Sequence, residues 1–136
     1  MADSKLTVAG HFDQQRAHEA AVELLSRDDR PSAVVAISNM MTVGLLFAIR
    51  ELGLRVPDDL SVVGIDDLEF AELLEPKPTA VTTPILAMAR RSIQKLLAQL
   101  GGKQTTVGNW EVYQPGLLVR QSTAPLVAAA VARQKR

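Results

Sequence analysis

Residues that could bind a small molecule occur in three short stretches of the chain. Phe12 lies in "GHFD", Ser38 and Asn39 lie in "SNMM", and Asp66 and Asp67 end the apolar run "LSVVGIDD". Carboxylates, amides and hydroxyls exchange hydrogen bonds with a polar ligand, and an aromatic ring can cover the apolar face of a ligand ring. The same residue types are common helix caps and turn formers, so their position alone leaves a structural role equally open.

The sequence offers much weaker support for catalysis or for metal binding. It contains no G-x-S-x-G, H-E-x-x-H, P-loop or G-x-G-x-x-G motif and no cysteine. His11 and His18 are too few ligands for a conventional zinc site. A phosphoacceptor pocket around Asp66 and Asp67 would also need a lone aspartate after another strand and a later lysine, and no residue order here supplies them convincingly. We therefore predict no enzyme, no catalytic residue, no metal site and no cofactor.

The composition indicates one compact domain or one lobe of a larger protein. The chain has 136 residues, of which 47% are hydrophobic, and its 15 basic and 15 acidic residues cancel. A chain without excess positive charge is a poor nucleic-acid binder by itself. Its N-terminus has no apolar signal-peptide core, and no apolar run approaches the ~20 residues that span a membrane. We expect a cytoplasmic protein without a membrane partner.

Hydrophobic patterns predict strands that alternate with helices. Strands are expected at 6–10, 33–38, 60–65 and 79–83, helices at 13–27, 40–52 and 85–100, a short turn or helix at 68–76, and one or two short strands within 110–122. The strand at 60–65 is apolar throughout, which is typical of a parallel strand covered on both faces. This order predicts an α/β, three-layer, Rossmann-like lobe with a mainly parallel sheet and helices on both faces. The tail, residues 124–136, is expected to be flexible.

The three polar stretches follow the first three of these predicted strands. In open α/β sheets, ligands bind outside the carboxyl ends of the strands. We therefore expect "GHFD", "SNMM" and "DD" to lie at one edge of the sheet.

The predicted helix at 40–52 is apolar on nearly all sides. One face would pack on the sheet, and the other would be covered either by a neighbouring element or by a second subunit. Leu73 and Leu74 could extend the same apolar patch. The sequence leaves both explanations open.

Two longer motifs resemble one known family. "GLRVPDDLSVVGIDD" and "LLVRQSTAP", with "SNMMTVG" before them and a long amphipathic helix between them, look like the C-terminal part of a LacI/GalR-type bacterial transcriptional regulator. The resemblance runs from about Val8 to Pro125. In that family a helix-turn-helix headpiece binds operator DNA, and a two-lobed core, similar to type I periplasmic binding proteins, senses a small effector and dimerises.

The resemblance implies that residues 6–123 form the C-terminal lobe of such a core. The DNA-binding headpiece and the N-terminal lobe have no counterpart in these residues. Operator DNA would therefore be bound only through the missing headpiece, and the isolated lobe, with one wall of the effector cleft, is expected to bind effector weakly or not at all.

Family roles can be assigned to individual positions. Asp66 matches the acid that hydrogen-bonds the effector, and Phe12 matches an aromatic that packs on the effector ring. Ser38 stands where an effector-binding Asn is frequent, and Asn39 matches the Asp or Asn beside it. His11 replaces the acid that usually precedes the aromatic residue.

A second set of positions matches the family's dimer interface. These positions are Val43, Leu73 and Leu74. The resemblance thus implies a homodimer.

The leading hypothesis is the effector-sensing and dimerising part of a transcriptional regulator, a repressor that responds to a sugar or sugar derivative. A purine would also suit an aromatic ring beside an acid. The alternative is the sugar-binding component of a transport system, which shares the fold. The missing signal peptide and the motif "VRQST" favour the regulator.

Overall fold

The structure is a computed structural model that describes residues 4–101 and 110–126. It divides into two compact units. Unit 1 comprises Met1–Val81 and Leu117–Arg136, and unit 2 comprises Thr82–Gly116. The candidate site lies in unit 1.

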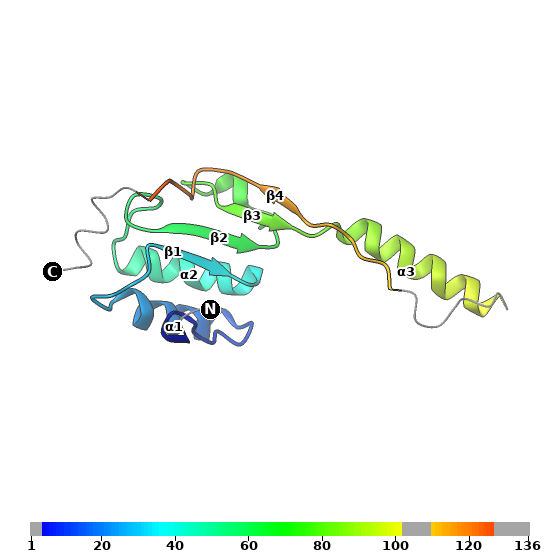
Figure 1. Ribbon diagram of the computed structural model, residues 1–136, viewed down its shortest axis with the longest axis horizontal. Helices are drawn as coiled ribbons and strands as arrows, with labels where there is room; N and C mark the ends of the chain where they lie inside the picture. Colours follow the sequence, from blue (N-terminus) through cyan, green and yellow to red (C-terminus); the bar gives the residue numbers. More distant parts are fainter. Residues whose placement is uncertain (1–3, 102–109, 127–136) are drawn as a thin grey trace. The chain divides into compact units, whose positions relative to one another are not determined.

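A mainly parallel sheet forms the centre of unit 1 (Figure 1). The strands are β1 (Ala33–Ala36), β2 (Ser61–Ile65), β3 (Thr79–Thr82) and β4 (Gly116–Leu118), in the spatial order β1-β2-β3-β4. β2 runs parallel to both β1 and β3, with Ala36 opposite Gly64 and Gly64 opposite Ala80. Parallel pairing places the carboxyl ends of these three strands at one edge of the sheet.

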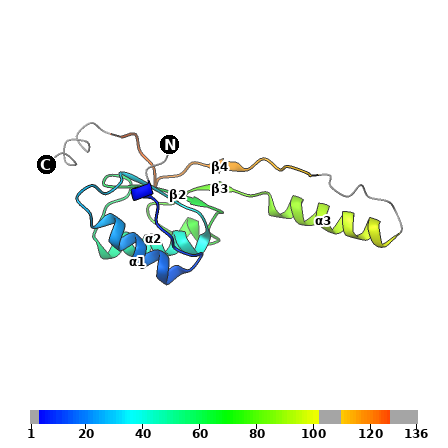
Figure 2. The ribbon, with the colours of Figure 1, turned by 60° about the horizontal axis from the view of Figure 1, so that its bottom comes forward.

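Two capped helices pack against this sheet. α1 (Gln14–Leu25) begins where the Asp13 carboxylate accepts a hydrogen bond from the Arg16 N–H, and α2 (Asn39–Glu51) begins where the Ser38 hydroxyl accepts one from the Met41 N–H. α2 lies against the sheet and α1 packs along α2 on the same side (Figures 1 and 2). Their shared core is apolar and comprises Ala21, Leu25, Ala36, Leu45, Ala48, Ile49, Leu60 and Val62.

A glycine allows the close approach of the two helices. A Cβ atom at Gly44 would lie 2.4 Å from the Gln14 carbonyl oxygen and 2.9 Å from the Ala17 Cβ atom. The helix predicted from 40–52 therefore contacts α1 closely at Gly44 and also lies against the sheet.

The predicted helix layers are only partly found within unit 1. Its two α-helices lie on one side of the sheet, whereas Val35 on β1 is 59% exposed. Among the described residues of unit 1, the second helix layer expected on the opposite face is not present.

The predicted strand at 6–10 is wrong. Leu6 belongs to a short 3-10 helix, η1 (Ser4–Leu6), and the next four residues extend without joining the sheet. A strand requires a neighbouring ladder, and this segment pairs with none; Leu6 and Val8 are accordingly 45% and 40% exposed. An apolar run is therefore not enough to define a strand.

Unit 2 contains the predicted amphipathic helix, α3 (Ile85–Leu100), in which no residue is buried. The exposed apolar side chains on this helix include Ile85, Leu86, Ile93, Leu96, Leu97 and Leu100. On its polar side Arg91 and Lys95 form ion pairs with Glu111 at 2.7 and 3.1 Å, and these bonds lower the pKa of Glu111 to about 2. The apolar stripe lacks a cover within the described part of unit 2.

The C-terminal expectations are met in part. Of the strands predicted within 110–122, β4 is present. Of the tail predicted to be flexible, residues 127–136 lie outside the described residues. None of the described helices is long and apolar enough to cross a membrane.

Candidate functional site

Ser38 and Asn39 follow β1 and begin α2. Ser38 caps the helix through its hydroxyl, which lies 3.3 Å from the Met41 nitrogen, and its carbonyl accepts a 2.9 Å hydrogen bond from the Thr42 hydroxyl. The structure thus gives Ser38 the capping role that its residue type also allows. A direct ligand contact by Ser38 stays a prediction.

Asn39 connects the ends of two strands. Its amide Nδ2 donates to the carbonyl oxygen of Asp67 at 3.5 Å, which links the end of β1 to the residues after β2. Its Oδ1 atom is buried and accepts no hydrogen bond in the structure. A buried acceptor without a donor is uncommon, because desolvation of the oxygen is left uncompensated.

Asp66 has an unusual backbone conformation at the end of β2. Its φ is +67°, in the left-handed region, while its N–H donates to the Val81 carbonyl on β3 at 2.9 Å. Left-handed geometry is unfavourable for residues with a Cβ atom, although Asp tolerates it better than most. The geometry turns the chain sharply at the carboxyl end of β2.

Phe12 lies on a second left-handed turn. His11 and Phe12 have φ values of +51° and +56°, and the turn is closed by a 2.9 Å bond from the Asp13 N–H to the Gly10 carbonyl. The Phe12 side chain is 66% exposed. Gly10 packs tightly beside α2, since a Cβ atom there would lie 2.8 Å from the Met41 Cε atom. The turn therefore sits beside the first turn of α2.

The three predicted stretches are thus grouped around the N-terminus of α2. Asn39 reaches the Asp66–Asp67 turn, and the Phe12 turn abuts Met41. A direct contact of Phe12, Ser38, Asn39 or Asp66 with a ligand stays a prediction. Within the described residues, no three His, Asp or Glu side chains are close enough to hold a metal ion.

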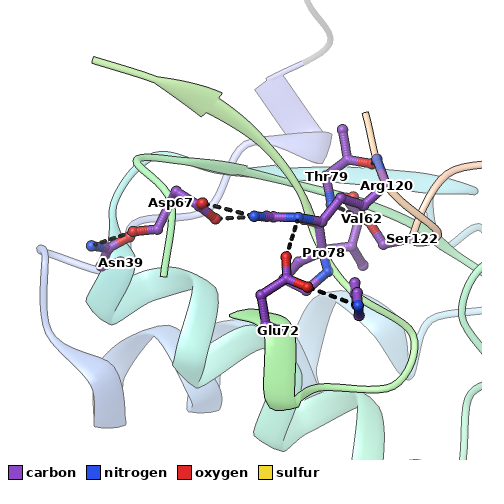
Figure 3. Close-up of polar contacts among 9 residues, drawn as sticks. Asn39, Val62, Asp67, Glu72, Pro78, Thr79, Arg120 and Ser122 are labelled. Carbon is purple, nitrogen blue, oxygen red and sulfur yellow. Dashed lines mark hydrogen bonds and ion pairs between the residues drawn. The ribbon is translucent and has the colours of Figure 1, made fainter. Parts of the chain in front are cut away.

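Sequence reasoning missed Arg120, which pairs with Asp67 (Figure 3). Its two terminal nitrogens contact the two carboxylate oxygens at 2.7 and 2.8 Å, and its side chain is only 12% exposed. The Arg120 guanidinium lowers the pKa of Asp67 mainly through these hydrogen bonds. Arg120 lies in the quoted motif "LLVRQST", but its partner is 53 residues away in the sequence. Asp67, the second acid of the "DD" pair, is therefore half of a partly buried fork.

Ser122, two residues after Arg120, fixes the same segment to the sheet. The buried Ser122 hydroxyl donates to the Val62 carbonyl at 2.6 Å and accepts from the Thr79 N–H at 2.7 Å, so it bridges β2 and β3 (Figure 3). The Ser122 carbonyl also accepts from the Val62 N–H at 2.8 Å. These bonds hold the backbone that presents Arg120.

The predicted dimer residues border an apolar groove. Val43 and Leu74 line a groove of about 450 Å³ together with Phe47 and Phe70. Leu73, on the 3-10 helix η2 (Ala71–Leu73), is 85% exposed. Leu73 directly precedes Leu74 of the groove lining, and the role of these positions in dimerisation stays a prediction.

Known proteins resemble this chain throughout the described fold. Residues 3–123 match the family model described as a periplasmic binding protein-like domain. The chain belongs to this family. Its fold, a mainly parallel open sheet with helices, is therefore confirmed as periplasmic-binding-protein-like.

The individual relatives are LacI-type regulators, which confirms the resemblance. The chain is 42% identical over 105 residues to the transcriptional regulator MalR of Streptomyces coelicolor, covering 77% of this chain and 30% of MalR. It is 34% identical over 113 residues to the transcriptional repressor PurR of Vibrio vulnificus, covering 83% of this chain and 34% of PurR. The chain thus spans about a third of the length of these curated relatives.

A solved structure gives the same result. The complex of the transcriptional regulator CelR with cellobiose aligns with a TM-score of 0.80 and 36% identity, covering 90% of this chain and 37% of that one.

Proposed function

We propose that this chain is the effector-sensing and dimerising part of a LacI/GalR-type transcriptional regulator, with residues 6–123 forming the C-terminal lobe of its core. The observation that carries the proposal is the cluster of left-handed residues at one sheet edge. Phe12 and Asp66, which the family resemblance assigns to the effector, both have positive φ. Unfavourable backbone geometry persists where the surrounding structure imposes it, and it is concentrated at ligand sites.

The proposed effector is a sugar or sugar derivative. The Asp66 carboxylate would accept hydrogen bonds from adjacent hydroxyls of the sugar. The exposed ring of Phe12 would cover the apolar face of the sugar ring. The structural relative CelR, a protein of this fold in complex with cellobiose, supports a sugar as the ligand class.

The proposed mechanism is a shift between two arrangements of the core lobes. Effector bound between the lobes favours one arrangement, which changes how the paired headpieces meet operator DNA. This chain supplies one wall of the cleft, so tight effector binding requires the second lobe. The regulator acts in the cytoplasm through binding rather than catalysis.

The proposed homodimer uses the apolar groove and Leu73. Leu73→Glu would place a charge in the interface and should shift the longer regulator from dimer to monomer in analytical ultracentrifugation. Leu6→Glu is the matched control, because Leu6 is an exposed leucine outside the groove. Equal dimer fractions for the two variants would contradict this interface.

The experiment for the sensing role uses the longer regulator that contains this chain. Its DNA binding is measured by fluorescence anisotropy with cellobiose, ribose or hypoxanthine added. We expect at least one sugar to change the DNA affinity and hypoxanthine to have no effect. A response to hypoxanthine alone would replace the sugar with a purine. A secretory signal in place of a helix-turn-helix upstream would favour the transport protein instead.

A further inference from the structure

We propose that Arg120 is a positioning residue for the effector site: by clamping Asp67, it holds Asp66 in its left-handed conformation and ties that turn to η2. This inference rests on the proposed function of Asp66 as an effector ligand. Arg120 itself would not touch the effector, and its action passes through the peptide between Asp66 and Asp67.

The clamp begins with a two-point contact. A guanidinium that binds both oxygens of a carboxylate fixes its orientation as well as its distance, which a single contact does not do. The Arg120–Asp67 contacts of 2.7 and 2.8 Å have this form, and Nη1 also donates to the Pro78 carbonyl at 2.9 Å. Arg120 is therefore fixed to the loop before β3 while it holds Asp67.

The backbone of Asp67 is held from another direction. The Asn39 amide donates to the Asp67 carbonyl at 3.5 Å, and the Asp66 N–H is bonded to Val81 at 2.9 Å. Residues 66 and 67 are thus tied to α2, to β3 and, through Arg120, to the segment after β4. A left-handed Asp is unfavourable by itself, so these ties maintain its geometry.

A further contact of Arg120 extends to the predicted dimer surface. Its Nε lies 3.4 Å from an oxygen of Glu72 in η2, and Glu72 also pairs with Lys77 at 2.7 Å (Figure 3). Glu72 directly precedes Leu73, the most exposed member of the predicted interface. One guanidinium therefore contacts both the effector turn and the segment that would face a second subunit.

The alternative is that Arg120 contributes only stability. The chain offers a matched control at the opposite end of β2. Arg55 binds both oxygens of Asp59 at 2.9 and 3.0 Å, but its side chain is 65% exposed and its partner is four residues away. Arg55→Met removes a similar fork without touching the effector turn.

The first experiment measures hydrogen exchange in this 136-residue chain without ligand. The Asp66 amide reports directly on the turn, because its bond to Val81 must open for exchange. In Arg120→Met, we expect exchange at residues 65–74 to accelerate roughly tenfold more than exchange in α1. Arg120→Lys keeps the charge but loses the fork, so it should rescue only part of the effect.

Two results of this experiment would overturn the proposal. One is unchanged exchange at residues 65–74 in Arg120→Met. The other is an equal increase in α1 and in this turn, which indicates a general loss of stability. If Arg120→Met fails to fold, Asp67→Asn removes the charge from the fork and should show the same local pattern; unchanged exchange there would also overturn the proposal.

The second experiment measures cellobiose and ribose binding to the longer regulator by calorimetry. We expect Arg120→Met to bind the active sugar at least about tenfold more weakly and Arg55→Met to remain within about twofold of wild type. Equal affinity of Arg120→Met and wild type would overturn the positioning role. If wild type binds neither sugar, the proposed sugar response fails, and the hydrogen-exchange result alone decides the role of Arg120.

Discussion

Both edges of the sheet in unit 1 contain left-handed backbone positions and an Arg–Asp pair, but the residues that form them differ. At the amino edge, where α2 leads towards β2, the left-handed position is Gly53, with φ +64° and no atom within 4 Å of the place where a Cβ atom would lie. At the carboxyl edge, the left-handed positions are His11, Phe12 and Asp66. Glycine adopts this conformation without a steric penalty because it has no Cβ atom, whereas the other three residues adopt it despite their Cβ atoms.

The Arg–Asp forks differ between the edges in a similar way. Arg55 is exposed and pairs with Asp59 four residues away in a local turn, while Arg120 is only 12% exposed and pairs with Asp67 in a distant segment. The amino edge therefore uses residues suited to its geometry. The carboxyl edge uses residues that carry a Cβ atom, and contacts from Asn39 and Arg120 hold its Asp66–Asp67 turn, which is typical of a site kept for binding.

The largest expected difference concerns the two forks. Arg120→Met should lower the free energy of unfolding by about 2 kcal/mol, because the Arg120 side chain is only 12% exposed and its bonds to Asp67 and Pro78 join distant segments. Arg55→Met should cost less than about 1 kcal/mol, because the Arg55 side chain is 65% exposed and its partner is four residues away. Urea denaturation followed by circular dichroism measures both. Equal losses of unfolding free energy in the two variants would contradict the proposed difference between the two edges.

Substitutions at two of the left-handed positions should change the stability of the chain in opposite directions. Gly53→Ala should destabilise the chain by about 1 kcal/mol, because alanine does not favour a positive φ. Phe12→Gly should stabilise it by up to about 1 kcal/mol, because the exposed ring contributes little burial and its backbone penalty is removed.

Thermal or urea unfolding of the two variants checks this pair. A destabilised Phe12→Gly variant would show that the ring contributes more to the fold than to a ligand site. Unchanged stability of Gly53→Ala would contradict the account of the amino edge.

The smallest expected effect concerns the dependence of folding stability on pH in the acid range. Arg55 lowers the pKa of Asp59 to about 2, and Arg120 lowers that of Asp67, in each case mainly through side-chain hydrogen bonds. A depressed folded-state pKa adds stability above the unfolded value of about 4, and that stability is lost as the pH falls through the folded value. Asp59→Asn and Asp67→Asn should therefore each flatten the decline of stability from about pH 4 to pH 2. Urea midpoints measured across this range check the effect, and a decline parallel to wild type would contradict it.

Much of the sheet and its helices could be predicted from local sequence. The runs around Val34, Val62 and Ala80 are short and apolar, and Asp13 and Ser38 mark helix starts by capping them. The strand predicted at 6–10 failed because strand formation depends on a partner that the local sequence does not reveal. An apolar strand likewise does not specify which element covers each of its faces, and within the described part of unit 1 both α-helices lie on one side of the sheet.

The candidate site was predictable in its residue types and its edge, but not in its geometry. Topology alone placed Asn39 and Asp66 at the ends of neighbouring strands. The left-handed turns at Phe12 and Asp66, and the long-range pairing of Asp67 with Arg120, depend on tertiary contacts. A motif can mark Arg120 as notable, yet only the fold identifies its partner.

The most direct test of the account is the effect of Asp66→Asn on sugar binding. Asn tolerates positive φ about as well as Asp, so the turn should be kept while the carboxylate charge is removed. Calorimetry of the longer regulator should show loss of binding to whichever of cellobiose or ribose the wild type binds, with an unchanged circular dichroism spectrum. Wild-type affinity in Asp66→Asn would contradict the assignment of this edge as the effector site.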